Sequence, residues 1–245
     1  MSKNFELLQR VAKDEYLRVP ESPARTANPA RPAIPFKKEP PDAEIANMVQ
    51  RLFSASGKGE VPRVVSFSGM AREDRSSWIC ARTAEALAAQ SDASVCIVDA
   101  NLWSPQLQKQ FAAAQASGLL EALGTDIPIR KFTLSLGAAN LWLLPAGQAK
   151  PAFTPSPERL RERFAELRAA FDYLLVSAPS LLRQTEATLL GQLADGVVLV
   201  VEAHHSRRET VRRAKEQLLG ANVNLLGAVL DQRTFPIPEK LYRKL

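Results

Sequence analysis

The chain has 245 residues and a net charge of +6, with 46% hydrophobic and 24% charged residues. This length is enough for one large domain with a tail, and the composition is that of a globular protein. No apolar run approaches the roughly 20 residues of a membrane-spanning helix, and residues 1–16 contain no signal-peptide core. We therefore expect a cytoplasmic protein whose two cysteines, Cys80 and Cys96, are buried and reduced.

Two segments precede the globular part of the sequence. Residues 1–17 carry Phe5, Leu8 and Val11 at helical spacing, which predicts a short amphipathic helix. Residues 18–41 contain seven of the 17 prolines and no glycine, which predicts an extended, semi-rigid linker. A helix held away from its domain in this way either docks on a partner or is a frayed terminus.

From residue 42 onward, apolar runs typical of buried strands alternate with segments at helical spacing. We expect strands at Arg63–Ser68, Ser94–Asp99, Asn140–Leu144, Asp172–Ser177, Gly196–Val201 and Asn224–Leu230. We expect helices at Ser76–Gln90, Pro157–Ala170, Glu186–Leu193 and Arg207–Leu219, and one more after Asp42. Asp42 is a candidate N-cap for that first helix, and Ser156 followed by Pro157 should start another. The alternation predicts an α/β domain of residues 42–245 with a doubly wound, mostly parallel sheet and helices on both faces.

Ligands of such sheets bind at the carboxyl ends of the strands, so the loop after the first strand is a candidate site. The stretch "VVSFSGMAREDRSSWICA", Val64–Ala81, resembles a phosphate-binding loop, whose usual pattern is G-x-x-x-x-G-K-[S/T]. Gly69 and Ser76 keep the first and last positions of that pattern. Asp74 stands where the second Gly belongs, and Arg75 replaces the Lys.

These two replacements weaken the case for nucleotide binding. Asp74 adds volume and negative charge where a phosphate would approach the backbone. One like-charge contact at ~4 Å costs about 4 kcal/mol at an effective dielectric of ~20, which is on the order of a thousandfold in affinity. Arg75 keeps the positive charge, but its guanidinium is a bulky fork rather than a flexible point charge. The pattern of residues 72–75 favours an ordinary solvated turn over a working phosphate-binding loop.

A set of ordered motifs carries a family resemblance. The motifs are "SFSGMAREDRSSW", "VCIVDANLWSPQL", "GLLEAL", "LWLLPAG", "FDYLLVSAPSLL", "LADGVVLVVEAHHSRRETVRRA" and "LLGAVLDQRTF". Together they resemble the cytoplasmic P-loop domain of the bacterial tyrosine kinases of capsular and exopolysaccharide assembly systems. The wider relatives of that family are the deviant-Walker ATPases of septum placement and plasmid partition. The resemblance covers roughly Glu44 to Leu230 and rests on the order of the whole set.

The resemblance implies a role for each residue that matches a family motif. The nucleotide-binding loop corresponds, in vestigial form, to Gly69, Asp74, Arg75, Ser76 and Ser77. The family's catalytic carboxylate near Mg²⁺ corresponds to Asp99, which could equally be a strand-end Asp bonded to the next loop. Asn101 and Ser177 replace two other carboxylates of the family pattern, and a Ser hydroxyl is a poor ligand for a hard cation. Ser76 and Asp99 would contact a metal only if Mg-ATP still binds.

We therefore expect a non-catalytic, tyrosine-kinase-like protein with no cofactor, acting as a cytoplasmic scaffold or regulator of exopolysaccharide or capsule biosynthesis and export. The partner that the resemblance implies is a membrane polysaccharide co-polymerase or another export-complex protein, which would hold the chain at the inner face of the membrane. A homo-oligomer is left open, and no specific nucleic acid is expected. The first alternative is an active tyrosine autokinase with Mg-ATP as its cofactor. The second is a positioning or partition-type ATPase relative.

Two further features leave alternatives open. The family usually carries a tyrosine cluster at its C-terminus, whereas this chain has three tyrosines in all. We expect Tyr173 in the core, and phosphorylation of Tyr16 or Tyr242 stays open. The helix of residues 207–219 has five Arg and Lys residues between positions 207 and 215. A solvated face explains this charge, and so does contact with an acidic partner or an anionic lipid.

Overall fold

The computed structural model describes residues 42–54, 61–70, 75–137, 140–148, 156–183 and 185–232. The predicted helix of residues 1–17, which includes Tyr16, and the linker of residues 18–41 lie outside the described residues, as do Asp74 and Tyr242. The boundaries assigned to these segments and to the domain of residues 42–245 stay predictions.

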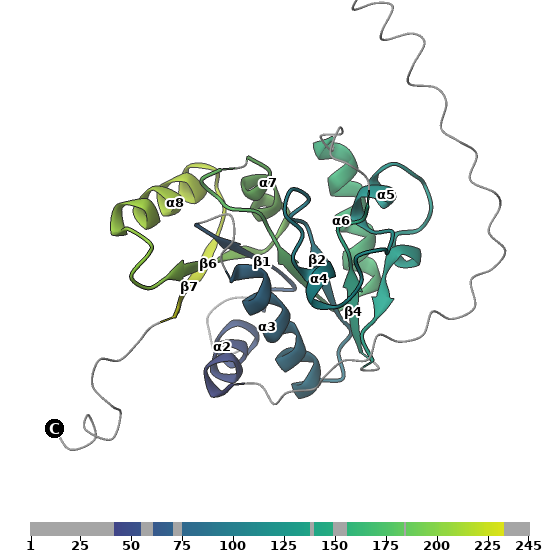
Figure 1. The fold of residues 1–245 in the computed structure, drawn as a ribbon, viewed down its shortest axis with the longest axis horizontal. Coiled ribbons are helices and arrows are strands. Elements are labelled where there is room, and N and C mark those ends of the chain that lie inside the picture. The colour runs from purple at the N-terminus through teal and green to yellow at the C-terminus, as the bar shows by residue number, and fades with distance from the viewer. Residues whose placement is uncertain are drawn as a thin grey trace, which may run out of the picture. The chain divides into compact units, whose positions relative to one another are not determined.

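A seven-stranded sheet has the strand order β3-β4-β2-β5-β1-β6-β7 (Figure 1). The strands are β1 (Val64–Gly69), β2 (Val95–Asp99), β3 (Leu134–Ser135), β4 (Leu141–Leu144), β5 (Tyr173–Ser177), β6 (Gly196–Glu202) and β7 (Leu225–Asp231). All neighbouring pairs are parallel except β3 with β4. β1 lies between β5 and β6, so it ends in the middle of the sheet's carboxyl edge and not at its margin.

Helices cover both faces of this sheet. One face carries α2 (Ala43–Phe53), α3 (Ser76–Gln90) and α4 (Leu107–Gln110). The other carries α5 (Leu119–Leu123), α6 (Pro157–Ala170), α7 (Thr185–Leu193) and α8 (Arg208–Gly220), with the 3-10 helix η1 (Ile129–Phe132) beside α6. Alternate residues of β1 enter the two layers, since Val65 and Phe67 pack with α3 whereas Val64 packs with α6. The predicted doubly wound α/β fold is confirmed.

All six predicted strands are present, and so are the four helices for which residue bounds were predicted. Their observed ends differ from the predicted ends by one residue or less. The sequence pattern missed β3, α4, α5 and η1, because elements of two to five residues are too short to show a period. Ser156 caps α6 as predicted, and its hydroxyl accepts a hydrogen bond from the N–H of Arg159 at 3.1 Å. The predicted N-cap position of Asp42 is confirmed.

Asp42 does occupy the N-cap position of α2, but its side chain makes no capping hydrogen bond. The residue is exposed, and its side chain does not pair with the N–H groups of the first helical turn. The helix is held to the domain by its buried face, where Ile45 and Val49 enter the core beside α3. Packing rather than capping therefore places α2.

Of three residues assigned to the core by the sequence, two are buried in it and the third packs against it. Cys80 and Cys96 are both fully buried free thiols. Burial raises the pKa of each thiol, and the charge of Asp99 adds to the rise at Cys80, so both are unreactive at neutral pH. Tyr173 starts β5 and meets the ring of Phe53 edge-on, with ring centroids 5.4 Å apart. Tyr173 is half-buried and packs against the core from its border, so it is less deeply placed than predicted.

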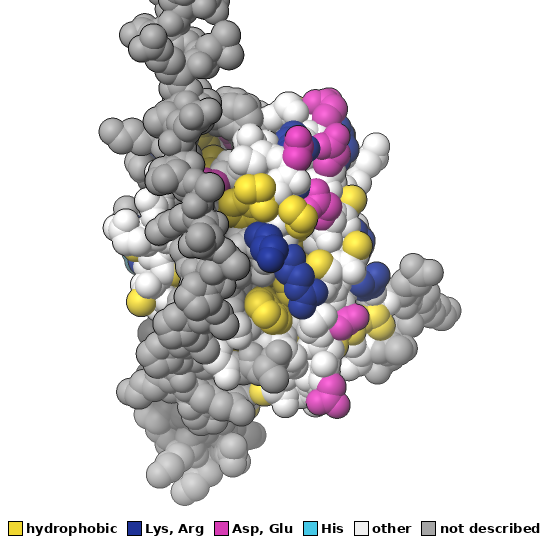
Figure 2. Space-filling model, turned by 90° about the vertical axis from the view of Figure 1, so that its right-hand side faces the viewer, with side chains coloured by type: hydrophobic (Ala, Val, Ile, Leu, Met, Phe, Trp, Pro, Cys, Tyr) yellow, Lys and Arg dark blue, Asp and Glu magenta, His cyan; other side chains and the backbone are white. Residues whose placement is uncertain are grey.

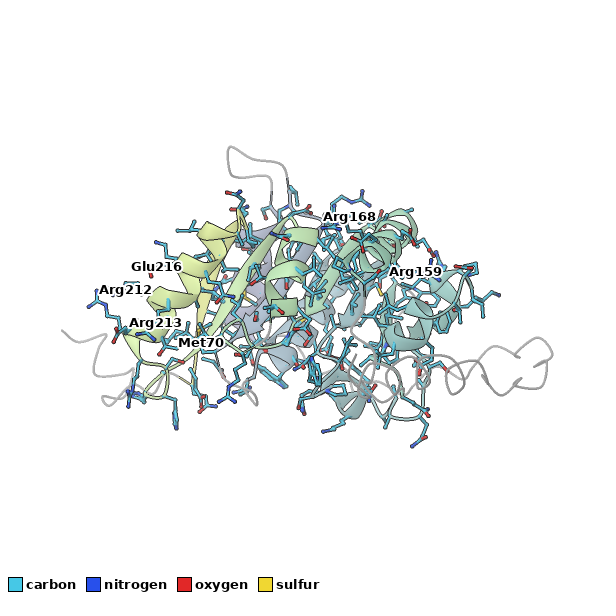
Figure 3. The ribbon with its side chains drawn as sticks, turned by 90° about the horizontal axis from the view of Figure 1, so that it is seen from above. Met70, Arg159, Arg168, Arg212, Arg213 and Glu216 are labelled. Carbon is cyan, nitrogen blue, oxygen red and sulfur yellow. The ribbon has the colours of Figure 1, made fainter. Side chains whose placement is uncertain are left out.

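The amino-terminal edge of the sheet is fixed by Asp195, which precedes β6. One of its carboxylate oxygens accepts hydrogen bonds from the N–H groups of Arg63 and Val64, both at 2.7 Å. The other accepts from Arg168 of α6, also at 2.7 Å; Figure 3 labels Arg168 on its helix. Burial alone would raise the pKa of Asp195, but these hydrogen bonds outweigh it and hold the pKa below its ordinary value.

A basic side chain stacks on aromatic rings at the β3–β4 end of the sheet. The guanidinium of Arg130 lies 5.3 Å from the ring centre of Trp142 and 5.2 Å from that of Phe171. Figure 2 shows this side of the molecule, where Lys and Arg side chains lie among hydrophobic ones. Such contacts contribute about 0.5–1 kcal/mol at exposed sites, so we assign Arg130 to the stability of this end.

Candidate functional site

The predicted site residues meet at the carboxyl edge of the sheet. Gly69 ends β1, Asp99 ends β2 and Ser177 ends β5. Asp99 and Ser177 are direct partners in the register of β2 with β5, so they stand side by side. Ser76 and Ser77 begin α3 and are both buried at this edge. The fold brings these five residues together because the ends of parallel strands coincide.

A hydrogen bond joins α3 to β5 inside the site. The hydroxyl oxygens of Ser77 and Ser177 are 2.8 Å apart, and both side chains are buried. Ser177 stands where the resemblance places a carboxylate, and the neighbouring helix satisfies its hydroxyl. The pair is neutral, so it supplies no charge for a divalent cation.

The end of β1 is also tied to the loop that follows β5. The Ser68 hydroxyl donates to the carbonyl of Pro179 at 2.5 Å, and the Ser180 hydroxyl donates to the carbonyl of Met70 at 3.0 Å. The N–H of Leu181 reaches the Gly69 carbonyl at 3.4 Å. These contacts fix the end of β1 against the segment that follows β5.

Arg75, in the position of the family's lysine, is directed toward the edge strand β7. Its guanidinium carbon lies 4.0 Å from the ring centre of Trp78, one turn further along α3. Its Nη1 lies 3.3 Å from a carboxylate oxygen of Asp231, the last residue of β7. The side chain is 41% exposed and Asp231 only 13%. The charge of Arg75 is therefore balanced by a carboxylate of the protein itself.

Asp99 is the buried carboxylate of the site. Its Oδ2 accepts hydrogen bonds from the N–H groups of Leu107 and Gln108, at 3.0 and 3.3 Å, which is the strand-end role that the sequence left open. Burial raises the pKa of Asp99 to about 7, against the opposing effect of these N–H groups. Its Oδ1 is also buried and has no hydrogen-bond partner in the described part of the chain. Asp99 thus holds the next loop with one oxygen and leaves the other unsatisfied.

Asn101, two residues further along, has a local role. Its side-chain oxygen accepts a hydrogen bond from the N–H of Ser104 at 3.2 Å, which closes a turn in the loop after β2. Across residues 42–54, 61–70, 75–137, 140–148, 156–183 and 185–232, no three His, Cys, Asp or Glu side chains are grouped so that they could hold a metal ion.

The sequence did not single out Trp78 or Asp231. Trp78 lies three residues after Arg75, so helical spacing could have indicated a stacked pair. Asp231 is 156 residues from Arg75, and only the strand order brings the two together.

The basic helix predicted near residue 207 is α8, and two of its basic side chains form ion pairs along the helix. Arg212 lies 3.5 Å from Glu216, and Arg213 lies 3.6 Å from Glu209. Figure 3 shows Arg212 and Arg213 projecting outward from α8. These exposed i,i+4 pairs are what a solvated face would carry. No helix in the part of the chain that the structure describes is long and apolar enough to cross a membrane.

No family model matches the chain, but curated proteins do. Tyrosine-protein kinase YwqD of Bacillus subtilis is 29% identical over 145 residues, which are 58% of this chain and 61% of YwqD. Succinoglycan biosynthesis transport protein ExoP of Rhizobium meliloti is 28% identical over 179 residues, or 71% of this chain and 23% of ExoP. The chain therefore spans less than two thirds of the length of either relative.

Solved structures share the fold. The chimerical protein CapA2B2 superposes with a TM-score of 0.72 at 22% identity, covering 81% of this chain and 87% of that one. The MinD cell division protein of Aquifex aeolicus superposes with a TM-score of 0.58 at 19% identity, covering 74% and 72%. By sequence the chain is similar to bacterial tyrosine-protein kinases such as YwqD, etk and CpsD, and it shares its fold with structures of MinD and of a ParA family ATPase.

Proposed function

We propose that this chain is a non-catalytic member of that kinase group, which acts as a scaffold or regulator in exopolysaccharide or capsule biosynthesis and export. The observation that carries the proposal is the Ser77–Ser177 hydrogen bond. A kinase site needs a carboxylate near the end of β5 to hold Mg²⁺ through its ligands, and this chain supplies a hydroxyl that α3 already engages.

The position of Arg75 supports the same proposal. A phosphate-binding lysine must reach the β- and γ-phosphates, whereas Arg75 stacks on Trp78 and pairs with Asp231. Redirecting it would break both contacts and leave the mostly buried Asp231 without its cation. Asp74 adds a negative charge to the same loop. Taken together, these residues do not fit Mg-ATP in the manner of the family.

The names of the relatives support a proposal for the partner and the location. ExoP is named as a transport protein of succinoglycan biosynthesis, and CapA2B2 is a chimera of two proteins. We place this chain beside a membrane polysaccharide co-polymerase or another export-complex protein, at the cytoplasmic face of the membrane. A homo-oligomer is compatible with this role, and nucleic acid is not part of it.

The second candidate is an active ATP-dependent tyrosine autokinase, and Asp99 favours it. This carboxylate is buried at the site and keeps one oxygen without a hydrogen-bond partner among the described residues. An unsatisfied buried acceptor is costly unless a ligand or water pairs with it. Ser76 and Asp99 would then be the metal contacts, with Asp99 as the catalytic residue.

Isothermal titration of the full chain with ATP in the presence of Mg²⁺ distinguishes the two. The scaffold proposal expects no binding tighter than about millimolar, which corresponds to roughly −4 kcal/mol. Micromolar affinity that Ser76→Ala or Asp99→Ala abolishes would establish the autokinase instead. Glu158→Gln, an exposed substitution on α6, is the matched control because α6 contributes none of the site residues.

A further inference from the structure

A groove with apolar walls lies between α2, the start of α3 and the edge strand β7. Its volume is about 640 Å³. Its walls include Ile45, Met48 and Leu52 from α2, Trp78 from α3, and Leu226 and Val229 from β7. Met48, Leu52 and Trp78 are only partly buried, so apolar surface meets water along the groove. Such a surface favours a further segment packed against it.

The two long walls of the groove, β7 and α2, differ in chemical character. Among the described residues β7 pairs with β6 alone, which leaves its other edge unpaired along the groove. An open edge with apolar neighbours is commonly covered by another part of the chain. The rim on the α2 side carries the exposed carboxylates of Asp42 and Glu44, with Arg51 one to two turns further along. A segment with apolar side chains and positive charge would match this groove.

The chain leaves β7 at the mouth of the groove. Gln232 lines it and has a φ of 55°, a left-handed conformation that turns the backbone away from the strand direction. Residues 233–245 follow in the sequence, as "RTFPIPEKLYRKL". They contain Phe235, Ile237 and Leu241, and they carry four basic residues against one acidic residue. The segment therefore combines the apolar side chains and the positive charge that the groove would accept.

Length and tethering favour this segment over others. Thirteen extended residues reach roughly 43 Å, whereas the eleven residues of α2 span roughly 16 Å, so the segment can cover the whole groove. A segment attached at the rim also has a far higher effective concentration there than residues 1–17, which are joined through 24 linker residues. A second copy of the chain would have to compete against the same local concentration.

We propose that residues 233–245 fold back into the groove between α2 and β7 and cover Trp78. The bound segment then contacts the surroundings of the Arg75–Asp231 pair, because Arg75 and Asp231 also line the groove. The C-terminal segment is thereby linked to the end of the phosphate-loop region. Its occupancy of the groove would hold Arg75 in its stacked position.

Site-directed cross-linking of the full chain tests this proposal. Asn47 is exposed on α2 beside the groove, and Asn47→Cys is combined with Leu241→Cys in the segment. Cys80 and Cys96 are fully buried and do not compete for a short bis-maleimide. The matched control is Arg161→Cys with Leu241→Cys, because Arg161 is exposed on α6 at the opposite face of the sheet.

The groove pair should give an intramolecular product at least about fivefold more than the control pair, as expected for a docked rather than a freely diffusing segment. Phe235→Ser with Ile237→Ser in the groove pair should reduce the yield to the control level, whereas Phe235→Leu should retain it. Equal yields in the two pairs would overturn the proposal. So would a product found only as a cross-linked dimer, since that outcome assigns the groove to a second copy.

Discussion

The hydroxyl groups of Ser77 and Ser177 lie 2.8 Å apart and join the first turn of α3 to the end of β5. Both side chains are buried, so the pair replaces a charged site with a neutral, satisfied contact. Ser177 is also the register partner of Asp99 on β2. A carboxylate at position 177 would therefore stand beside a second buried carboxylate, which is costly without a cation between them.

This relationship predicts how ATP binding could be restored. The triple variant Asp74→Gly, Arg75→Lys and Ser177→Asp should bind Mg-ATP measurably by isothermal titration, whereas each single substitution should bind little, because the site works as a unit. Ser177→Asp alone should lower the thermal midpoint, and added Mg²⁺ should recover part of the loss only in the triple variant. A folded triple variant that binds no ATP would mean that the loop geometry, and not residue identity, blocks the site.

The raised pKa of Asp99 predicts a pH-dependent stability. In the unfolded chain this pKa is ordinary, 3.8, and in the folded protein burial raises it to about 7. The folded state thus keeps a proton that the unfolded state releases, so this contribution is complete below about pH 4 and is lost as the pH rises through about 7. Asp99→Asn cannot ionise and should be more stable than the parent at pH 8, by up to about 4 kcal/mol.

Urea unfolding at pH 5 and pH 8 measures this effect. Asp99→Asn should flatten the difference between the two pH values, because its amide oxygen can still accept from the N–H groups of Leu107 and Gln108. Asp92→Asn, an exposed substitution after α3, serves as the control and should leave the difference unchanged. An unaltered pH dependence in Asp99→Asn would show that Asp99 stays ionised in the folded protein.

Asp195 predicts the opposite pH dependence. Its folded pKa is held below the ordinary 3.8, so its stabilising contribution is present above about pH 4 and is lost as the pH falls through the lower folded value. Asp195→Asn should cost about 2 kcal/mol at pH 7, because it weakens two backbone hydrogen bonds and the pair with Arg168. Denaturant titrations at pH 7 and pH 3 should show a smaller stability difference between the parent and the variant at pH 3. If the difference in free energy of unfolding between parent and variant were the same at both pH values, the destabilisation would come from packing and not from the charge of Asp195.

If the predicted helix of residues 1–17 docks on a partner protein, its removal should affect partner binding but not the stability of the domain. Deletion of residues 1–41 should leave the thermal midpoint nearly unchanged, because a proline-rich linker contributes little to a core. The same deletion should abolish co-purification with membrane components of the export system. A large fall in the midpoint would instead place this helix in the core of the domain.

The sequence alone determined the architecture, because the strands of a sheet that helices cover on both faces have a recognisable apolar sequence pattern. Strands such as β5 and β6 are nearly continuous apolar runs, and the intervening helices repeat at their own period. β3 has two residues and no period, so local pattern could not reveal it. Asp42 has the residue type of a cap without its hydrogen bond, since cap geometry depends on how the preceding chain approaches.

At the site, the sequence identified which residues end the strands, because parallel strands bring their carboxyl ends to one edge. It could not identify the partners those residues take. Ser77 and Ser177 are 100 residues apart, and Arg75 and Asp231 are 156 apart, so strand order and register alone decide that they meet. The raised pKa of Asp99 is likewise a property of the packed layers around β2, since desolvation exists only once the sheet is covered on both faces.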